Sequence, residues 1–275
     1  MQSKITGGQT ELLFTVRVLS KYDVTYYRCI DTGFIQTEEP HWLEEAYSSA
    51  ITKLDVGLVL RNQNMATITE NLVYHHFDHN KKFLDYAGGY GLFTRMMRDK
   101  GYDFYNTDIY CQNIFAEFQD LSQLPEDTHF ELVTAFEVLE HLPQPMETLK
   151  TMFDKYDNVL FSTELVPKDV KPLKDWWYFI FETGQHVAFY TTEALEFIAK
   201  KYNRHLYSNG SNIHLFSRKI LTENPFIAGI HQDKYFIKKI RAKLERYDRR
   251  NNVNLTPNKL SLMSKDMEAI KKKLL

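Results

Sequence analysis

The alternation of apolar and polar positions divides the chain into segments of different secondary structure. Between residues 81 and 220, short apolar runs typical of buried strands alternate with stretches whose apolar positions recur at helical spacing. Strands are predicted at 81–87, 102–108, 130–138 and 158–166, and helices at 92–101 and 191–202. This alternation predicts an α/β fold, a parallel sheet with right-handed crossovers. Two closely spaced runs, at 205–209 and 213–219, predict an antiparallel hairpin at one edge.

The residues before this alternation predict a leader of mixed strands and helices. Three short stretches rich in Val, Ile, Tyr and Phe predict strands, at 12–19, 24–30 and 33–36. Two helices are predicted after them, over 42–54 following Pro40 and over 63–79.

Two segments depart from the alternation. Residues 166–190 form a long insertion that holds two Trp, two Tyr and three Phe, an aromatic content that argues against disorder. Residues 222–275 predict two helices, over 231–250 and about 259–274. The first of these helices would place four apolar residues on one face: Phe236, Ile240, Leu244 and Tyr247. We therefore expect a leader (1–69), a core (70–221) and a helical tail (222–275).

Composition narrows the class of protein. The 275 residues are 43% hydrophobic and 25% charged, which is ordinary for a soluble globular protein. Two cysteines, Cys29 and Cys111, exclude a scaffold built on disulfides and a zinc site with four cysteines. No run reaches the roughly 18 apolar residues of a membrane span, and the start of the chain lacks the pattern of a signal peptide. A cytoplasmic protein is therefore expected.

The formal charge of −2 conceals a basic tail. Residues 231–275 hold 13 Lys and Arg against 5 Asp and Glu, a balance of +8, so the other 230 residues carry −10. The near-neutral total gives no reason to expect nucleic acid as a partner. The tail could dock on an acidic partner, approach the inner face of an anionic membrane, or pack on the body of the protein.

The strongest chemical signal is a glycine-rich turn between a strand and a helix. Residues 85–91 have the sequence DYAGGYG, whose glycines let the backbone approach a ligand closely. Asp108 ends the next strand 23 residues after Asp85, where an acid in a nucleotide-binding sheet accepts hydrogen bonds from a ribose. Neither the phosphate-binding loop nor the dinucleotide fingerprint fits this stretch. The turn suits a cationic nucleoside without phosphate, or it binds no ligand.

These residues resemble the motifs of class I methyltransferases that depend on S-adenosylmethionine (SAM). Residues 85–91 are similar to the first motif, with Ala87 where the family usually has Gly, and residues 130–145 are similar to the fourth-strand motif. The resemblance implies a Rossmann-like, mostly parallel sheet with an antiparallel last strand. It also implies that Asp108 binds the ribose, and that Asp120 and Leu121, after a short third strand, lie beside the adenine. The implied cofactor contacts are Asp85, Ala87, Gly88, Gly89, Gly91, Asp108, Ile109, Asp120, Leu121 and Phe136.

A second constellation follows the fourth strand. Glu137, Glu140 and His141 are spaced to share one face, and such a group could bind Mg²⁺ or another divalent metal, or act as acid and base. The stretch resembles ubiquinone-pathway and small-RNA O-methyltransferases in which this motif binds a metal with a later His, here His186. A metal bound by these four residues would activate a hydroxyl acceptor. Alternatively, His141 or His186 acts as general base, with Glu137 as the third catalytic candidate, or the group is structural.

The acceptor is expected at the carboxyl end of the sheet. Aromatic residues of the insertion could stack on it or could pack the insertion against the core: Trp176, Trp177, Tyr178, Phe189 and Tyr190. Residues 26–62 resemble the leader of methyltransferases associated with bacterial surface-polysaccharide glycosyltransferases, which implies a carbohydrate acceptor and a glycosyltransferase as a candidate partner. The implied acceptor contacts in this leader are His41, Trp42, Asp55, Arg61 and Asn62. Relatives often carry a Cys-x-x-Cys pair where this chain has Cys29 alone, so no structural zinc is expected.

The combined expectation is a SAM-dependent methyltransferase that methylates a sugar hydroxyl on a polysaccharide, a glycan or a nucleotide-linked sugar. Two alternatives stay open. The same core could methylate carbon or nitrogen of a sugar or another small molecule, or it could be a SAM-binding scaffold without catalytic activity.

Overall fold

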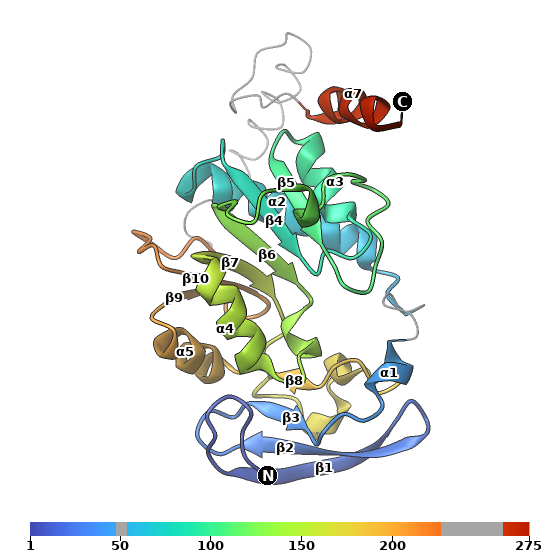
Figure 1. Ribbon diagram of the computed structural model, residues 1–275. Coiled ribbons are helices and arrows are strands. Elements are labelled where there is room, and N and C mark those ends of the chain that lie inside the picture. Colours follow the sequence, from blue (N-terminus) through green and yellow to red (C-terminus); the bar gives the residue numbers. More distant parts are fainter. Residues whose placement is uncertain (48–53, 227–260, 275) are drawn as a thin grey trace, which may run out of the picture.

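A six-stranded sheet lies at the centre of the computed structural model, which describes residues 1–47, 54–226 and 261–274 (Figure 1). The strand order is β5-β4-β6-β7-β10-β9. The first four of these strands run parallel, and β10 is antiparallel to both of its neighbours. The strands are β4 (Lys82–Tyr86), β5 (Asp103–Thr107), β6 (Leu132–Phe136), β7 (Asn158–Ser162), β9 (His205–Ser208) and β10 (Ile213–Ser217). The expected α/β sheet and its edge hairpin are confirmed.

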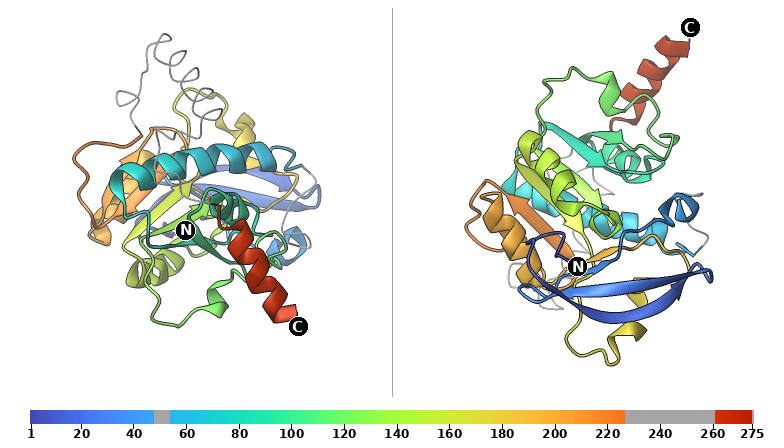
Figure 2. Two further views of the ribbon diagram at one scale, coloured as in Figure 1. Left: turned by 90° about the horizontal axis from the view of Figure 1, so that it is seen from above. Right: turned by 60° about the horizontal axis from the view of Figure 1, so that its bottom comes forward.

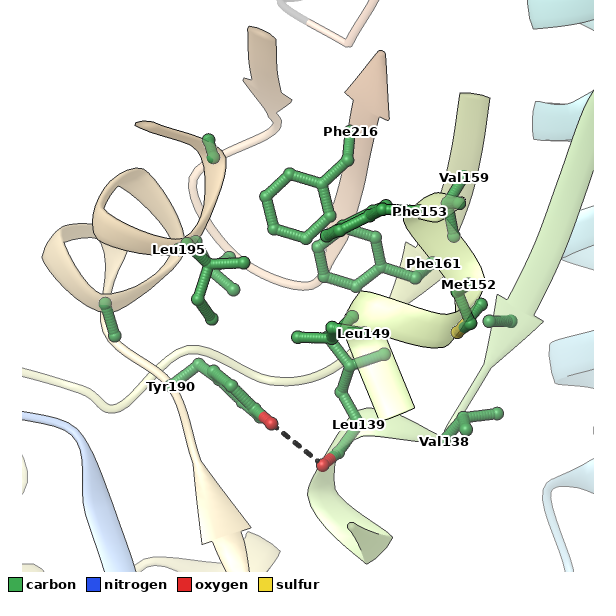
Figure 3. Packing of buried hydrophobic residues seen from close by; sticks show 14 of the residues in the cluster. Val138, Leu139, Leu149, Met152, Phe153, Val159, Phe161, Tyr190, Leu195 and Phe216 are labelled. Carbon is green, nitrogen blue, oxygen red and sulfur yellow. Dashed lines mark hydrogen bonds between the residues drawn. The ribbon is translucent and has the colours of Figure 1, made fainter. Parts of the chain in front are cut away.

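Helices cover both faces of this sheet, which explains why the central strands are continuously apolar. One face packs against α2 (Leu58–His76) and α3 (Leu92–Asp99), and the other against α4 (Pro145–Lys155) and α5 (Thr192–Lys201) (Figure 2). On the second face, the rings of Phe161 and Phe216 stack with centroids 4.7 Å apart, and Phe153 of α4 packs edge-on against Phe216 (Figure 3). Thr191 caps the start of α5, since its side chain accepts a hydrogen bond from the Ala194 amide.

The aromatic insertion completes a second sheet. The leader strands β1 (Thr10–Val18), β2 (Tyr22–Cys29) and β3 (Ile35–Thr37) are antiparallel, and β8 (Ala188–Phe189) of the insertion adds to β3. Short 3₁₀ turns precede it, η3 (Leu173–Asp175) and η4 (Trp177–Phe179). The rings of Phe179 and Phe189 pack 4.6 Å apart and contact Tyr26 of β2. Most of the insertion's aromatic residues therefore build the core beneath the leader sheet.

The helices of the leader differ from their predicted bounds. α1 spans only Leu43–Ala46 of the predicted 42–54, and residues 48–53 lie outside the described residues. α2 begins at Leu58 rather than at residue 63. The expected boundary between leader and core falls inside α2, and this division stays a prediction. The expected short third strand is reduced to an isolated parallel bridge between Asn106 and Asp120.

The tail is described in part. The predicted helix 231–250 lies outside the described residues, whereas the second helix is present as α7 (Met263–Leu274). α7 packs on the body of the protein, because its Asp266 forms ion pairs with Arg95 and Arg98 of α3. None of the helices in the described ranges is long and apolar enough to cross a membrane.

Tyr190 offers a test of its structural role. Its buried hydroxyl donates a 3.0 Å hydrogen bond to the Leu139 carbonyl (Figure 3). Tyr190→Phe leaves that carbonyl with only the 3.3 Å bond from the Leu142 amide and should lower the free energy of unfolding by about 1 kcal/mol in urea titrations. Tyr202→Phe is the matched control, because Tyr202 donates a similar bond to the Met146 carbonyl at a partly exposed site. An equal or smaller loss for Tyr190→Phe would contradict this role.

Candidate active site

A large cavity opens at the carboxyl ends of the parallel strands. Its volume is about 1140 Å³, and it is lined by the start of α2, the turn after β4, the segment after β5, the end of β6 and part of the insertion. Single-ligand pockets usually span about 300–1,000 Å³, so this cavity has room for a cofactor and an acceptor together.

The glycine-rich turn adopts the conformation that its sequence allows. Gly89 and Gly91 have φ of +56° and +81°, and Ala87 lies in the same left-handed region with φ of +54°. Ala is therefore tolerated where the related motif has Gly, at a cost of about 1–2 kcal/mol. Gly88 is required for a different reason, because a Cβ there would overlap carboxylate oxygen Oδ2 of Asp85 and amide oxygen Oδ1 of Asn106.

Two aspartates hold this turn. Asp85 is buried and accepts a 2.8 Å hydrogen bond from the Thr134 hydroxyl, and its burial raises its pKa to about 7. Asp108 is half-buried, and its Oδ2 accepts a 2.9 Å bond from the Gly89 amide. The other oxygen of Asp108 accepts bonds from the Tyr110 and Cys111 amides. Asp108 thus joins the glycine turn to the segment after β5 at the edge of the cavity.

Asp120 supports the glycine-rich turn indirectly, through Asn113. Its carboxylate accepts a 3.0 Å bond from Asn113, whose own Oδ1 lies so close to Gly91 that a Cβ there would overlap it. Leu121 packs at the edge of the core. Neither Asp120 nor Leu121 lines the cavity, and their expected contact with adenine stays a prediction.

The second constellation comes together beside the cavity. One ligand atom from each of Glu140, His141 and His186 lies within 4.8 Å of the others. His186 comes from the insertion, 45 residues after His141, so the fold unites what the sequence separates. Glu137 takes no part in this group, because its carboxylate accepts a 2.6 Å bond from the Ser162 hydroxyl.

Backbone carbonyls orient both imidazoles. The Nδ1 atom of His141 lies 3.2 Å from the Gln185 carbonyl oxygen, and that of His186 lies 2.7 Å from the Tyr178 carbonyl oxygen. A carbonyl only accepts, so each Nδ1 carries the proton and each Nε2 keeps a free lone pair. This arrangement is the usual way in which a protein prepares histidines as metal ligands.

Glu140 is a buried carboxylate whose oxygens form no hydrogen bond of regular geometry among the described residues. The Tyr178 and Thr163 hydroxyls lie close to it and favour its ionised form, but neither is positioned for a regular hydrogen bond. Burial raises the pKa of Glu137 and of Glu140 to about 7, and burial lowers the pKa of His141 to about 4 and of His186 to about 3. Unpaired carboxylate oxygens next to two neutral imidazoles fit a divalent cation.

The expected site residues fall into two groups. The cavity is lined by Asp85, Ala87, Gly88, Gly89, Asp108, Ile109, Phe136, Glu137, His141, His186, Trp177, Tyr178, Arg61, Asn62 and Asp55. Other expected residues do not line it: Gly91, Asp120, Leu121, Glu140, Trp176, Tyr190, His41 and Trp42. Trp176 and Tyr190 are buried in packing, and Trp42 donates a 2.8 Å bond to the Gly184 carbonyl. His41 is exposed beside Tyr22.

Among the residues of the cavity wall that sequence reasoning missed, four form two contacting pairs. Glu164 accepts a 3.0 Å hydrogen bond from Asn212, and both residues line the cavity next to β7 and β10. The rings of Tyr47 and Tyr110 stack with centroids 5.0 Å apart and nearly parallel planes. No sequence motif marks these positions, because each pair joins segments that are distant in the chain.

A family model described as a methyltransferase domain matches residues 60–208, more than half of the chain. The chain belongs to this methyltransferase family. The expected class I methyltransferase core is thereby confirmed at the level of family and fold, whereas the resemblance to polysaccharide-associated enzymes stays a prediction. A search of curated proteins finds none whose sequence matches the chain.

Several solved structures are similar to this methyltransferase-family chain. An O-methyltransferase family protein from Burkholderia thailandensis shares 12% identity with a TM-score of 0.45, over 66% of this chain and 64% of that one. An O-methyltransferase family 2 protein from Planctomyces limnophilus, in complex with apigenin, shares 16% identity with a TM-score of 0.44 over 60% of each chain. A methyltransferase of calicheamicin biosynthesis, in its S-adenosylhomocysteine-bound form, shares 14% identity with a TM-score of 0.40, over 64% of this chain and 61% of that one. The chain thus spans less than two thirds of the length of these structures.

Glu140→Gln tests the burial of the unpaired carboxylate. The raised pKa means that the folded state holds the Glu140 proton more tightly than the unfolded state, so wild-type stability is lost as pH rises from about 4.5 to about 7. The variant escapes this loss, and its stability relative to wild type should increase over that window by more than about 1 kcal/mol. The shifts of His141 and His186 have the opposite sign, but both proteins retain those residues.

The measurement is urea unfolding between pH 4.5 and 8 in the presence of a chelator. Glu147→Gln is the control, because Glu147 is exposed on α4. Parallel stability curves for wild type and Glu140→Gln would contradict the burial of a charge. Adding Mn²⁺ is the complement, since a cation bound by ionised Glu140 should raise the melting temperature of wild type and not of the variant.

Proposed function

We propose that the protein is a SAM-dependent O-methyltransferase that acts on a hydroxyl of a sugar or another polyol. One observation carries the proposal: Asp108, fastened to the glycine turn, shares a single cavity with His141 and His186. A ribose-binding acid and a hydroxyl-activating group within one cavity are what a methyl transfer from SAM to oxygen requires.

The donor half of the cavity consists of the glycine turn and the segment after β5. Asp108 would accept hydrogen bonds from the ribose, and the exposed side chain of Ile109 would lie against the adenine. The raised pKa of Asp85 means that this buried acid gains from a nearby cation, and the sulfonium of SAM is a cation.

The acceptor hydroxyl would be deprotonated beside Glu137 and the two histidines. Glu137, whose pKa of about 7 suits a general base, would take the proton as the oxygen attacks the methyl carbon. SAM would supply the methyl group: the new oxygen–carbon bond would replace its carbon–sulfur bond, whose electron pair would stay on sulfur, and S-adenosylhomocysteine (SAH) would be the product. A metal held by Glu140, His141 and His186 would lower the pKa of the hydroxyl. Two imidazole donors favour Mn²⁺, Fe²⁺ or Zn²⁺ over Mg²⁺ at such a site.

A polyol acceptor is supported by further residues of the cavity wall. The ring of Trp177 is 66% exposed although it lines the cavity, and it offers a flat surface for a sugar face. Glu164 and Asn212, already paired with each other, offer acceptor and donor atoms to neighbouring hydroxyls. The resemblance of residues 26–62 to polysaccharide-associated methyltransferases supports the same acceptor class.

The donor half is tested by binding of SAH to the full-length protein. Asp108→Ala removes the ribose acceptor and should weaken binding about 10- to 100-fold, since each hydrogen bond to a charged group contributes about 1.5–3 kcal/mol. Isothermal calorimetry gives the dissociation constants, and Asp108→Asn tests the charge at constant size. Asp127→Ala, at an exposed position, is the control. A wild type that binds no SAH at millimolar concentration would refute the proposed function.

The acceptor half is tested with isotopically labelled SAM and a panel of nucleotide-linked sugars. We expect a product heavier by one methylene, with the methyl group on oxygen by NMR, and chelation should slow its formation. Glu164→Gln should raise KM for the sugar about 10-fold without changing SAH affinity, because it weakens contacts made to the acceptor alone. Glu196→Gln, exposed on α5, is the control. A methyl on carbon or nitrogen, or SAH binding without any transfer, would exclude O-methylation of these acceptors.

A further inference from the structure

The C-terminal helix is attached to the protein through its acid and not mainly through its lysines. Asp266 of α7 accepts hydrogen bonds from Arg98 Nε (2.8 Å) and Nη2 (2.7 Å), and from Arg95 Nη1 (3.0 Å). The Asp266 and Arg98 side chains are only 5% and 3% exposed. The Leu262 amide, just before α7, donates a 3.0 Å bond to the Arg98 carbonyl. A basic tail thus contributes a buried carboxylate to the body.

The other end of α7 reaches the segment that follows β5. Lys273 donates a 3.0 Å hydrogen bond to the Gln123 side chain, and its ammonium lies 4.6 Å from the ring centroid of Phe118. α7 therefore extends from the C-terminal end of α3 to residues 118–123 (Figure 2).

Residues 108–123 carry much of the donor half of the cavity. Between the end of β5 and η1 (Leu121–Gln123), the structure describes no helix or longer strand, only the bridge of Asp120. Large apolar side chains here are open to solvent, with Ile109, Tyr110 and Phe115 exposed by 86%, 63% and 49%. Three residues of this segment are buried, Asn113, Ala116 and Gln119, so the conformation of the rest depends on the contacts that the segment makes with its neighbours.

Residues 108–123 are held by contacts on two sides. On the inner side, the amides of Ile114 and Phe115 donate to the Tyr90 carbonyl, and Asp108 accepts from the Gly89 amide. On the outer side is α7, which Arg98 also connects to β5, since Arg98 donates 2.8 Å bonds to Asp103 and to the Phe104 carbonyl. Asp103 and Phe104 begin β5, so the ion network reaches the segment indirectly, through the strand that precedes it, whereas Lys273 contacts the segment directly at Phe118 and Gln123.

We propose that α7 is a latch that holds residues 108–123 in the conformation that binds the cofactor, with Asp266 as its positioning residue. Loss of the carboxylate leaves the buried Arg98 paired, among the described residues, with the single acid Asp103, and this change favours release of α7. Residues 108–123 then become ordered only when the cofactor binds, and the entropy lost in ordering them weakens binding. The effect on affinity rests on the proposed function, whereas the effect on residues 108–123 does not.

The test compares full-length wild type with Asp266→Asn, which keeps the size of the side chain. Calorimetry at about 15 °C, near the temperature of maximum stability, should show SAH binding weakened about 5- to 10-fold. Hydrogen exchange should be faster for amides 109–119 and for α7, and unchanged in β4 and β6. Asp266→Glu, which restores the charge, should recover part of the affinity. Asp154→Asn is the matched control, because it breaks the 2.6 Å ion pair with Lys150 on the exposed face of α4.

The outcomes separate the two proposals. Faster exchange of α7 without faster exchange at 109–119, or with unchanged SAH affinity, would overturn the latch. Unchanged exchange of α7 in Asp266→Asn would overturn the role of Asp266. A wild type that binds no SAH would refute the proposed function, and exchange at 109–119 would still decide whether α7 restrains this segment.

Discussion

The site depends on the burial of carboxyl groups at the edge where the parallel strands end. Asp85 at the end of β4, and Glu137 and Glu140 after β6, are all buried enough to raise their pKa to about 7. Burial penalises their charged forms, and few cationic groups nearby offset the penalty. Arg61 is a cation that interacts with Glu137 and Glu140, but its guanidinium already donates hydrogen bonds to both oxygens of Asp55. The edge therefore favours a ligand that brings positive charge.

The leader sheet helps to create this low-polarity environment. It places the aromatic core of the insertion over the carboxyl ends of the strands, and the insertion returns His186 to His141. The Trp42 indole secures this arrangement through its bond to the Gly184 carbonyl. The group of Glu140, His141 and His186 is consequently shared between the central sheet and the insertion, and the leader supports its position by packing.

The sequence predicted those parts of the molecule that depend on local pattern. The apolar run 130–138 predicted a buried strand, which the structure contains as β6, and the glycines of residues 85–91 permit the left-handed backbone found at Gly89 and Gly91. The sequence could not predict which aromatic residues of the insertion pack in the core and which line the cavity. Trp176, which is buried, and Trp177, which lines the cavity, are neighbours in the same aromatic stretch. The Glu164–Asn212 pair was missed for the same reason, since it depends on the adjacency of β7 and β10.

The pairing of β3 with β8 has a consequence for the order in which the protein folds. The leader strands leave the ribosome about 150 residues before β8, and their apolar face has no core until the insertion has been synthesised. Contacts so distant in sequence form slowly, because a long loop must close before they contribute. Until the insertion has been synthesised, the nascent leader therefore exposes a sheet edge and Tyr and Phe side chains. Binding by a chaperone is the usual protection of such a surface during synthesis.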